Sequence, residues 1–360
     1  MTVRSAACIA RWGLLVILLF SLTVRAAADG PQPILADPPI MPQRPAGVPL
    51  PVYATAAGCQ TGSQCIYLPL VPAFQNGAGS RAYAVSLYNS AYLGSANVPA
   101  GWNGNISNCA PGTTTQAFRD SVLLRLNYYR EMAGLAKLAG FDPSYNSQDQ
   151  AAALMMAANQ ALNHTPPSSW KCYTQTGYDG ASSSNLALGA YGPNAIDLYM
   201  GDGGVSSLGH RRWVLYPQTQ KMGSGDITGS SWQNQSNALK AWDDHIWDAR
   251  PSTRYDFVAW PPPSFIPYQV VFPAWSFAVA GADFANASVT VTSGGANVAV
   301  TVSQPPNGYG ENTLAFTVAG CNPCSRPAAD TAYRVTINNV SDGGTLRSYS
   351  YTVTLIDPAK

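Results

Sequence analysis

The chain has 360 residues, of which 20 are Lys or Arg and 19 are Asp or Glu, so its formal net charge is +1. That balance, with no basic run anywhere, argues against a nucleic-acid binder that works by bulk electrostatics. Charged residues make up 11% of the chain and hydrophobic residues 46%, which excludes generic disorder and favours a loop- and strand-rich extracellular protein. The length predicts about two domains, each with room for a core.

The first 28 residues have the pattern of a secretory leader. Two arginines precede an apolar run over residues 12–24, and three alanines lead into Asp29. This order of basic, apolar and small residues predicts a signal peptide over residues 1–28 that is cleaved after Ala28. The run is too short to span a bilayer, and no later stretch approaches the roughly 18 apolar residues of a spanning helix. We therefore expect a secreted protein whose mature chain has no membrane span.

The cysteines agree with an oxidising compartment. One of the seven lies in the leader, and the six that remain form an even set, which predicts disulfide bonds in an exported chain. Proximity in sequence favours the pairs Cys59–Cys65 and Cys321–Cys324, with Cys109–Cys172 as the remainder. Other pairings stay open. The Cys-x-x-Cys spacing at residues 321–324 also suits a metal, but no second such motif completes a zinc ribbon.

Residues 29–98 precede the first strong periodic signal. Prolines crowd residues 29–51, which predicts an extended, polyproline-like linker with no means of forming a core. Residues 52–98 hold tyrosines, glycines, serines and short apolar patches, and they predict a few short strands or an irregular arm. We therefore assign residues 29–98 to a proline-rich linker and an irregular N-terminal segment.

Helical periodicity begins after three threonines at residues 113–115, any of which can cap a helix. Apolar residues at spacings of three and four share one face of this first helix, which Gly134 is expected to end. A second helix is predicted from Ser147, as its cap, to His164, before a pair of prolines that cannot continue it. A short third helix is predicted over residues 194–200, behind a proline.

After residue 260 the hydrophobic period changes from that of a helix to that of a strand. About seven short alternating runs follow, separated by Gly, Asn, Pro and Ser clusters. Residues 293–297 and 341–345 have the composition of hairpin turns. This spacing predicts an all-β sandwich of immunoglobulin or fibronectin type over residues 264–360.

The chain has three histidines, and two of them suggest a metal site. His164 and His210 would serve as imidazole ligands, with Asp202 or water completing the shell. The two histidines form no local motif, and no H-E-x-x-H is present, which excludes a zincin. The sequence therefore leaves the cofactor open, with zinc or another divalent cation as the candidate.

A Ser–His–Asp hydrolase is a second candidate for the same residues. It would use His210, Asp202 and one of Ser184, Ser206 or Ser207. The G-x-S-x-G turn that exposes such a serine in one large class of hydrolases is absent. A glycosidase would need two facing carboxylates, and residues 145–225 contain no Glu and few Asp.

The plain alternative to catalysis is a structural role for these polar residues. His164 and His210 would then form hydrogen bonds within a polar cleft. Arg130, in a helix with few charges, is expected to bind a buried carboxylate or carbonyl. Arg211 and Arg212 would line the mouth of the cleft or be solvated.

The order of several weak motifs along the chain is more specific than any one of them. The motifs are N-x-Y-R at 127–130, the segment ending in His164, S-N-L-A at 184–187, the helix at 195–202 and G-H-R at 209–211. This succession resembles the CAP superfamily of cysteine-rich secretory, antigen 5 and pathogenesis-related 1 proteins, most closely its microbial branch. The resemblance implies an α-β-α sandwich with a central cleft over residues 99–260, and an α+β chain as a whole.

The resemblance also implies a cleft built from two histidines and two acidic residues. The matching positions here are His164, Ser184, Asp202 and His210, with Asn185 beside them. Ser184 stands where the family has a Glu, so one acid is lost. Less negative charge is then available to hold a cation, and no general base lies beside a bound water.

The resemblance favours a non-catalytic extracellular binding protein whose ligand is a lipid, a sterol or a cell-surface molecule. The alternative is a metal-dependent hydrolase or peptidase that uses His164, His210 and Asp202. A third hypothesis makes residues 264–360 an adhesive module and the CAP domain its scaffold. The sequence chooses no ligand among these classes and gives no oligomeric state.

Overall fold

The computed structural model describes residues 32–45, 66–67 and 78–360. It divides the chain into two compact units, and the architecture below is that of the second, Pro33–Lys360. The predicted leader, Cys59 and Cys65 lie outside the described residues. In the part of the chain that is described, no helix is both long enough and apolar enough to cross a membrane.

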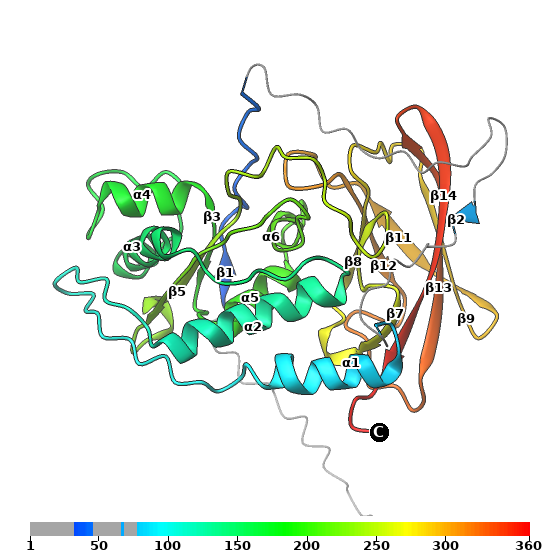
Figure 1. The fold of residues 1–360 in the computed structure, drawn as a ribbon, viewed down its shortest axis with the longest axis horizontal. Helices are drawn as coiled ribbons and strands as arrows, with labels where there is room; N and C mark the ends of the chain where they lie inside the picture. The colour runs from blue at the N-terminus through cyan, green and yellow to red at the C-terminus, as the bar shows by residue number, and fades with distance from the viewer. Residues whose placement is uncertain (1–31, 46–65, 68–77) are drawn as a thin grey trace, which may run out of the picture. The chain divides into compact units, whose positions relative to one another are not determined.

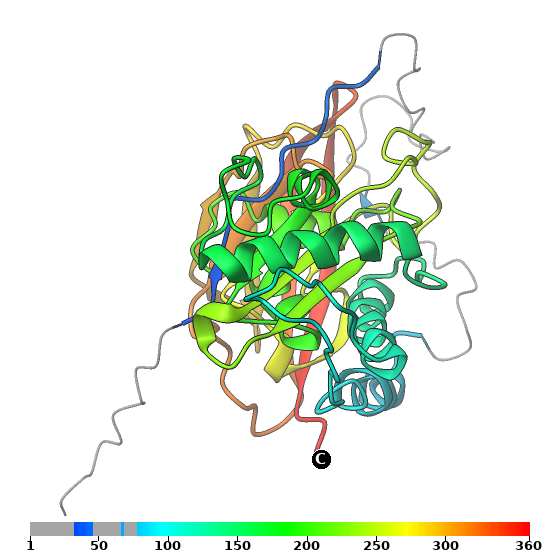
Figure 2. The ribbon, with the colours of Figure 1, turned by 90° about the vertical axis from the view of Figure 1, so that its left-hand side faces the viewer.

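One half of this unit is a four-stranded antiparallel sheet between two layers of helices (Figure 1). The strand order is β1 (Ile34–Leu35), β3 (Ser184–Leu188), β5 (Gln235–Lys240), β4 (Ser224–Thr228). Helices α3 (Pro143–Asn159) and α4 (Gln175–Ser182) cover one face, and Figure 2 shows α3 lying across the sheet. The other face packs against α2 (Gln116–Met132) and α5 (Pro193–Gly201).

Alternation along β3 explains the two layers. Leu186 packs with α3, whereas its neighbour Ala187 packs into the core on the α2 and α5 side. Successive side chains of a strand point to opposite faces, so a strand covered on both faces has all its side chains buried. All five residues of β3 are buried. The three-layer arrangement implied by the family resemblance is present.

The first predicted helix is confirmed. Helix α2 begins after Thr115, whose side chain accepts a hydrogen bond from the backbone N–H of Phe118. Such a cap satisfies one of the free N–H groups of the first turn. Gly134 follows the helix with a φ of +81°, a left-handed conformation that glycine adopts without strain. The predicted third helix is also confirmed as α5, with Pro193 in its first turn.

The second predicted helix exists, but both of its predicted ends are wrong. Asp142 caps α3 through two backbone N–H groups and Pro143 occupies the first turn, so the helix starts before Ser147. It ends at Asn159, because Gln160 adopts a left-handed conformation with a φ of 52°. His164 therefore lies in a bend beyond the helix and not at its C-terminus.

Two parts of the N-terminal segment are more ordered than predicted. Within residues 33–45, which were expected as part of a linker, Ile34 and Leu35 form an edge strand, with Ile34 opposite Leu188 and Leu35 opposite Ala187. Residues 81–93, expected as strands or irregular chain, form α1 (Arg81–Leu87) and a π-helix (Tyr88–Leu93). The side chain of Ser80 caps α1. The assignment of residues 29–98 as one region stays a prediction.

The other half of the unit consists of two further sheets. One has the order β11 (Val300–Ser303), β12 (Thr313–Val318), β8 (Ala274–Ala278), β6 (Val258–Trp260). The other has the order β10 (Ala296–Val298), β9 (Ser288–Ser293), β13 (Thr331–Asp342), β14 (Thr345–Ile356), β2 (Ile66–Tyr67), and β7 (Ser264–Pro267) also pairs with β14. Two sheets agree with the predicted sandwich, while its immunoglobulin or fibronectin type stays a prediction.

Both predicted hairpin turns are present in this half. Gly294 and Gly295 join β9 to β10, and Gly343 and Gly344 join β13 to β14, all four with positive φ. Two-residue hairpin loops need this conformation, which glycine supplies. The first of the predicted alternating runs, residues 270–272, forms no strand: Val270 ends a short 3-10 helix, and the next two residues have no regular structure.

The two halves share one hydrophobic core. A single cluster of buried side chains runs from Leu126 and Val214 to Trp275 and Phe277. At the junction, the rings of Tyr129 and Trp260 meet edge to face with 5.1 Å between their centroids. The predicted boundary at residues 260–264 therefore lies inside a continuous core.

Candidate functional site

The strongest feature of the predicted cleft is a buried histidine–aspartate pair. Helix α5 ends at Asp202 in a left-handed conformation, and α6 (Gly209–Val214) carries His210 in its first turn. The Nδ1 of His210 lies 2.7 Å from Asp202 Oδ1, and both side chains are fully buried. The other carboxylate oxygen accepts the backbone N–H of Arg211 at 3.2 Å. An Nδ1–H that donates to Asp202 leaves a lone pair on Nε2 of the neutral ring.

The atoms beside this pair lack partners. Neither His210 Nε2 nor Asn185 Oδ1 makes a hydrogen bond within the described part of the chain, and both are buried. The Asn185 amide Nδ2 donates to the backbone carbonyl of His210 at 3.3 Å, so the two residues adjoin. The ring of Tyr199 stacks on His210 at 5.5 Å. Unpartnered buried polar atoms cost stability, so this spot is suited to receiving a polar group.

His164 lies near His210 but is engaged elsewhere. Its Nδ1 contacts the carbonyl of Ala181 and its Nε2 the carbonyl of Asp37, each at 2.6 Å. Burial lowers the pKa of His164, while these carbonyls oppose the shift by favouring the charged ring. A neutral imidazole has one N–H, so it satisfies one carbonyl at a time.

Ser184 is turned away from the histidines. Its hydroxyl donates to Asp149 Oδ1 at 2.6 Å, on the α3 face of the sheet. The next side chain, Asn185, points to the other face, where it donates to the carbonyl of His210. The backbone N–H of Lys240 donates to the second oxygen of Asp149 at 3.1 Å. Burial raises the pKa of Asp149 to about 7, and the Ser184 and Lys240 interactions oppose the shift. The structure thus places Ser184 with a buried carboxylate instead of with His210.

Asp149 and Lys240 were missed as site residues by the sequence reasoning. The Lys240 ammonium donates to Ser183 Oγ at 2.6 Å and lies 4.7 Å from the Tyr145 ring, and burial lowers the pKa of this lysine. The sequence carried a signal for Lys240, a charge among apolar neighbours at 238–242, but none for Asp149, whose neighbours at 146–150 are polar. A charged residue is rarely buried unless it has a partner.

The side chains around His164 and His210 do not form a metal site in this arrangement. Among the described residues, no group of three or more His, Cys, Asp or Glu side chains is placed to hold an ion. Catalytic zinc takes three protein ligands, whereas here His210 Nε2 is free and both nitrogens of His164 contact carbonyls. Cys321 and Cys324 pair with each other. The assignment of metal to His164 and His210 stays a prediction.

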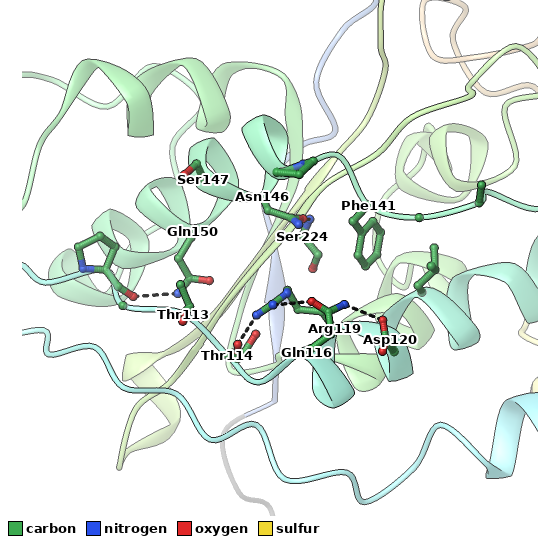
Figure 3. A pocket seen from close by; sticks show the side chains of 16 residues that line it. Thr113, Thr114, Gln116, Arg119, Asp120, Phe141, Asn146, Ser147, Gln150 and Ser224 are labelled. Carbon is green, nitrogen blue, oxygen red and sulfur yellow. Dashed lines mark hydrogen bonds between the residues drawn. The ribbon is translucent and has the colours of Figure 1, made fainter.

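An open pocket lies between the starts of α2 and α3 (Figure 3). Its volume is about 520 Å³. Arg119 donates to Gln116 Oε1 at 2.7 Å, and the Gln116 amide donates to Asp120 at 2.8 Å. Other labelled side chains on its wall are Thr113, Thr114, Phe141, Asn146, Ser147, Gln150 and Ser224. The sequence reasoning did not find this pocket, because its residues come from separate loops and helix starts.

A second open pocket, of about 470 Å³, has more apolar walls. Tyr191, Leu198 and Phe272 line it, together with Pro33 of the N-terminal segment. Asp197, which also lies on its wall, is paired with Arg125 and accepts from Tyr129 at 2.7 Å. Among the described residues of this wall, Asp197 is the only carboxylate, and its charge is balanced by Arg125.

Comparison with known families agrees with this geometry. Residues 123–247 match the family model described as CAP: Cysteine-rich secretory protein family. The matched segment runs from α2 through the sheet and the His210–Asp202 pair to the loop after β5. No curated protein matches the chain. The match supports the CAP superfamily for this segment, which covers less than half of the chain.

Proposed function

We propose that this chain is a secreted CAP-domain protein that binds a ligand without turnover. The supporting observation is that the His210–Asp202 pair is buried, whereas the two pockets are open. No described side chain forms a hydrogen bond with His210 Nε2, so no serine or cysteine nucleophile is poised beside it. The pocket between α2 and α3 is accessible and has the size of a small-molecule site.

The chemistry of that pocket favours a neutral ligand rich in hydroxyl groups. Its wall combines one guanidinium, Arg119, with one carboxylate, Asp120, so neither ionic sign dominates. Amide and hydroxyl side chains supply donors and acceptors, and the ring of Phe141 supplies an apolar face. A saccharide offers both hydroxyls and apolar C–H faces. Of the expected ligand classes, a cell-surface saccharide therefore suits this pocket best.

The test is a calorimetric titration of the mature protein with neutral di- and trisaccharides of hexoses and N-acetylhexosamines. Ser147→Trp should abolish binding, because Ser147 lies on the pocket wall and an indole there fills the space. Ser144→Trp is the matched control: it is exposed on the same helix turn and does not line the pocket. Equal loss in both variants, or no binding by the wild type, contradicts the saccharide assignment.

The apolar pocket provides the lipid arm of the same test. Gly203 lines it, and a Cβ on Gly203 would meet no atom within 4 Å, so the backbone there has room for a side chain and the indole of Gly203→Trp should fill the pocket. Binding of cholesterol or a fatty acid that Gly203→Trp removes and Ser147→Trp leaves intact would assign the ligand to this second pocket instead.

A hydrolase is the second candidate, and the His210–Asp202 pair is the observation that favours it. A histidine held by a carboxylate with a free Nε2 is the arrangement of a general base. This candidate predicts turnover of ester or peptide substrates that His210→Gln abolishes. The metal-dependent version, with His164 as well, further predicts loss of turnover with a chelator. Turnover that survives both treatments would exclude this cleft as its source.

A further inference from the structure

Residues 33–45, which we call the N-terminal arm, pass beside β3 (Figure 1) and contact His164 and α6. We propose that the surface under the arm, which we call the groove, is a binding site for an extended, proline-containing peptide, and that the arm occupies it in cis. The proposal goes beyond ligand binding at the two open pockets. It is argued below from four kinds of contact, each of which reads the backbone or the prolines of the arm.

The first contact is strand addition. Ile34 and Leu35 pair antiparallel with β3, and the N–H of Ala36 donates to the carbonyl of Leu186 at 3.2 Å. In the described sheet, β1 is the outer strand, so the arm covers the hydrogen-bonding edge of β3. Adding an extended peptide to a sheet edge is a general mode of peptide recognition that depends on main-chain hydrogen bonds.

The second contact seats the pair of prolines. Pro38 and Pro39 are both buried although they belong to a surface segment. The Nε1–H of Trp213 donates to the Pro39 carbonyl at 2.8 Å. A tryptophan N–H that binds a carbonyl beside a proline is how aromatic grooves recognise polyproline-like chains.

The third contact fixes the residue beneath Pro38. A Cβ built on Gly209 would lie 2.3 Å from Pro38 Cγ and 2.9 Å from Tyr309 Cδ1. Any larger side chain at Gly209 would therefore push the proline ring out. Glycine here lets the peptide approach α6 closely, one residue before His210.

The fourth contact closes the groove at its two sides. The carbonyl of Asp37 is 2.6 Å from His164 Nε2, and the N–H of Met41 donates to the carbonyl of Gly308 at 2.7 Å. The side chain of Asp37 is exposed, and Ile40 is 68% exposed. The groove thus binds the backbone and the Pro-Pro step and leaves Asp37 and Ile40 free, while Leu35, Ala36 and Met41 pack against the protein. It fits an extended segment with consecutive prolines and apolar residues on both sides of them.

The arm also contacts one histidine of the predicted cleft. The carbonyl of Asp37 takes the Nε2 of His164, and Pro38 lies against Gly209, the neighbour of His210 in the chain. A segment of the same chain competes with outside peptides at an effective concentration on the order of millimolar. A partner's proline-containing segment would therefore bind only when the arm is displaced, and displacement would free the Nε2 of His164.

The experiment keeps the full chain and weakens the arm. Ala36→Pro removes the N–H that bonds to Leu186 and so loosens the arm, whereas Asp37→Asn is the matched control because only the backbone of Asp37 is bound. The probe is a fluorescein-labelled synthetic peptide of residues 33–42. By fluorescence anisotropy, the Ala36→Pro chain should bind it at least about tenfold more tightly than the wild type or the control. The same peptide with Pro38 and Pro39 replaced by alanine should bind more weakly.

Trp213→Phe in the Ala36→Pro chain tests whether the probe enters this groove, since it removes the N–H donor and keeps a ring. If Ala36→Pro fails to fold, Pro38→Glu serves as the second arm variant. A folded arm variant that does not bind the probe overturns the proposal, as does equal binding by all chains. If the arm variant forms dimers, dissociation of those dimers by the probe supports the proposal. Dimers that the probe does not dissociate count against it. Saccharide titration of the same chains is independent, so the two proposals can fail separately.

Discussion

At the residue scale, the buried charges of this protein are held by specific partners. Arg130 is fully buried and donates to four backbone carbonyls, including those of Ala136 and Thr219. Burial lowers the pKa of Arg130 to about 10. The expectation of a buried carbonyl partner is therefore confirmed. It could be predicted because an arginine in an apolar helix has few other options.

The cleft could be predicted only in part. Asp202 and His210 lie together with Asn185, while Ser184 turns to Asp149 on the opposite face. The direction in which a strand side chain points depends on register, which spacing along the chain does not give. The carbonyl partners of His164 could not be predicted either, because one of them, Asp37, belongs to the N-terminal arm, far away in the sequence.

Asp149 should make stability depend on pH. Burial raises its folded-state pKa from 3.8 to about 7, so the native state binds a proton more tightly than the unfolded state. The stabilising contribution of this group is complete below pH 4 and is lost as the pH rises through about 7. Asp149→Asn mimics the protonated form, so its unfolding free energy should fall less between pH 5 and pH 8 than that of the wild type. Urea unfolding at the two pH values measures this, and identical slopes would refute the assignment.

At the element scale, local signals located most helices but not all of their ends. A threonine cap and a following glycine set the limits of α2, and paired glycines set both hairpins. The end of α3 was misplaced because Gln160 adopts a left-handed conformation that its residue type does not announce. The arm was misassigned as linker because its strand pairing is long-range and its proline content is typical of unpaired chain.

The Cys109–Cys172 disulfide should stabilise the layer that contains α3. It spans 63 residues and joins the loop before α2 to the loop after α3. Replacing both cysteines by serine should lower the unfolding free energy by about 2–4 kcal/mol, since a long loop is then released in the unfolded chain. The Cys321→Ser/Cys324→Ser pair, which spans only 3 residues, is the control and should cost less. Equal losses in thermal unfolding would contradict this loop-length argument.

At the scale of the whole molecule, the two halves depend on each other. The shared core runs through Tyr129, Trp260 and Trp275, and Arg211 of α6 donates to the carbonyl of Ala274 at 2.6 Å in the second half. The sequence predicted the two architectures but not the core that they share, because contacts between distant segments produce no periodic pattern in the sequence. The hypothesis that residues 264–360 act alone as an adhesive module therefore requires a fragment that lacks the part of the shared core contributed by residues before 264.

This shared core predicts one cooperative unfolding transition for residues 78–360. Trp260→Ala removes a fully buried ring at the junction and should cost about 3–5 kcal/mol in both halves together. Calorimetry and near-ultraviolet circular dichroism would follow the unfolding. Two separate transitions, with only one shifted by the substitution, would show that the halves fold independently.

The central claim is that this chain binds its ligand at an open pocket and does not hydrolyse it at the His210–Asp202 pair. The most direct measurement is saccharide titration of the mature protein beside its His210→Gln and Ser147→Trp variants, with product analysis of each mixture. We predict unchanged affinity in His210→Gln, lost binding in Ser147→Trp and intact saccharide throughout. Product formation that disappears in His210→Gln would contradict the account and make the cleft an active site.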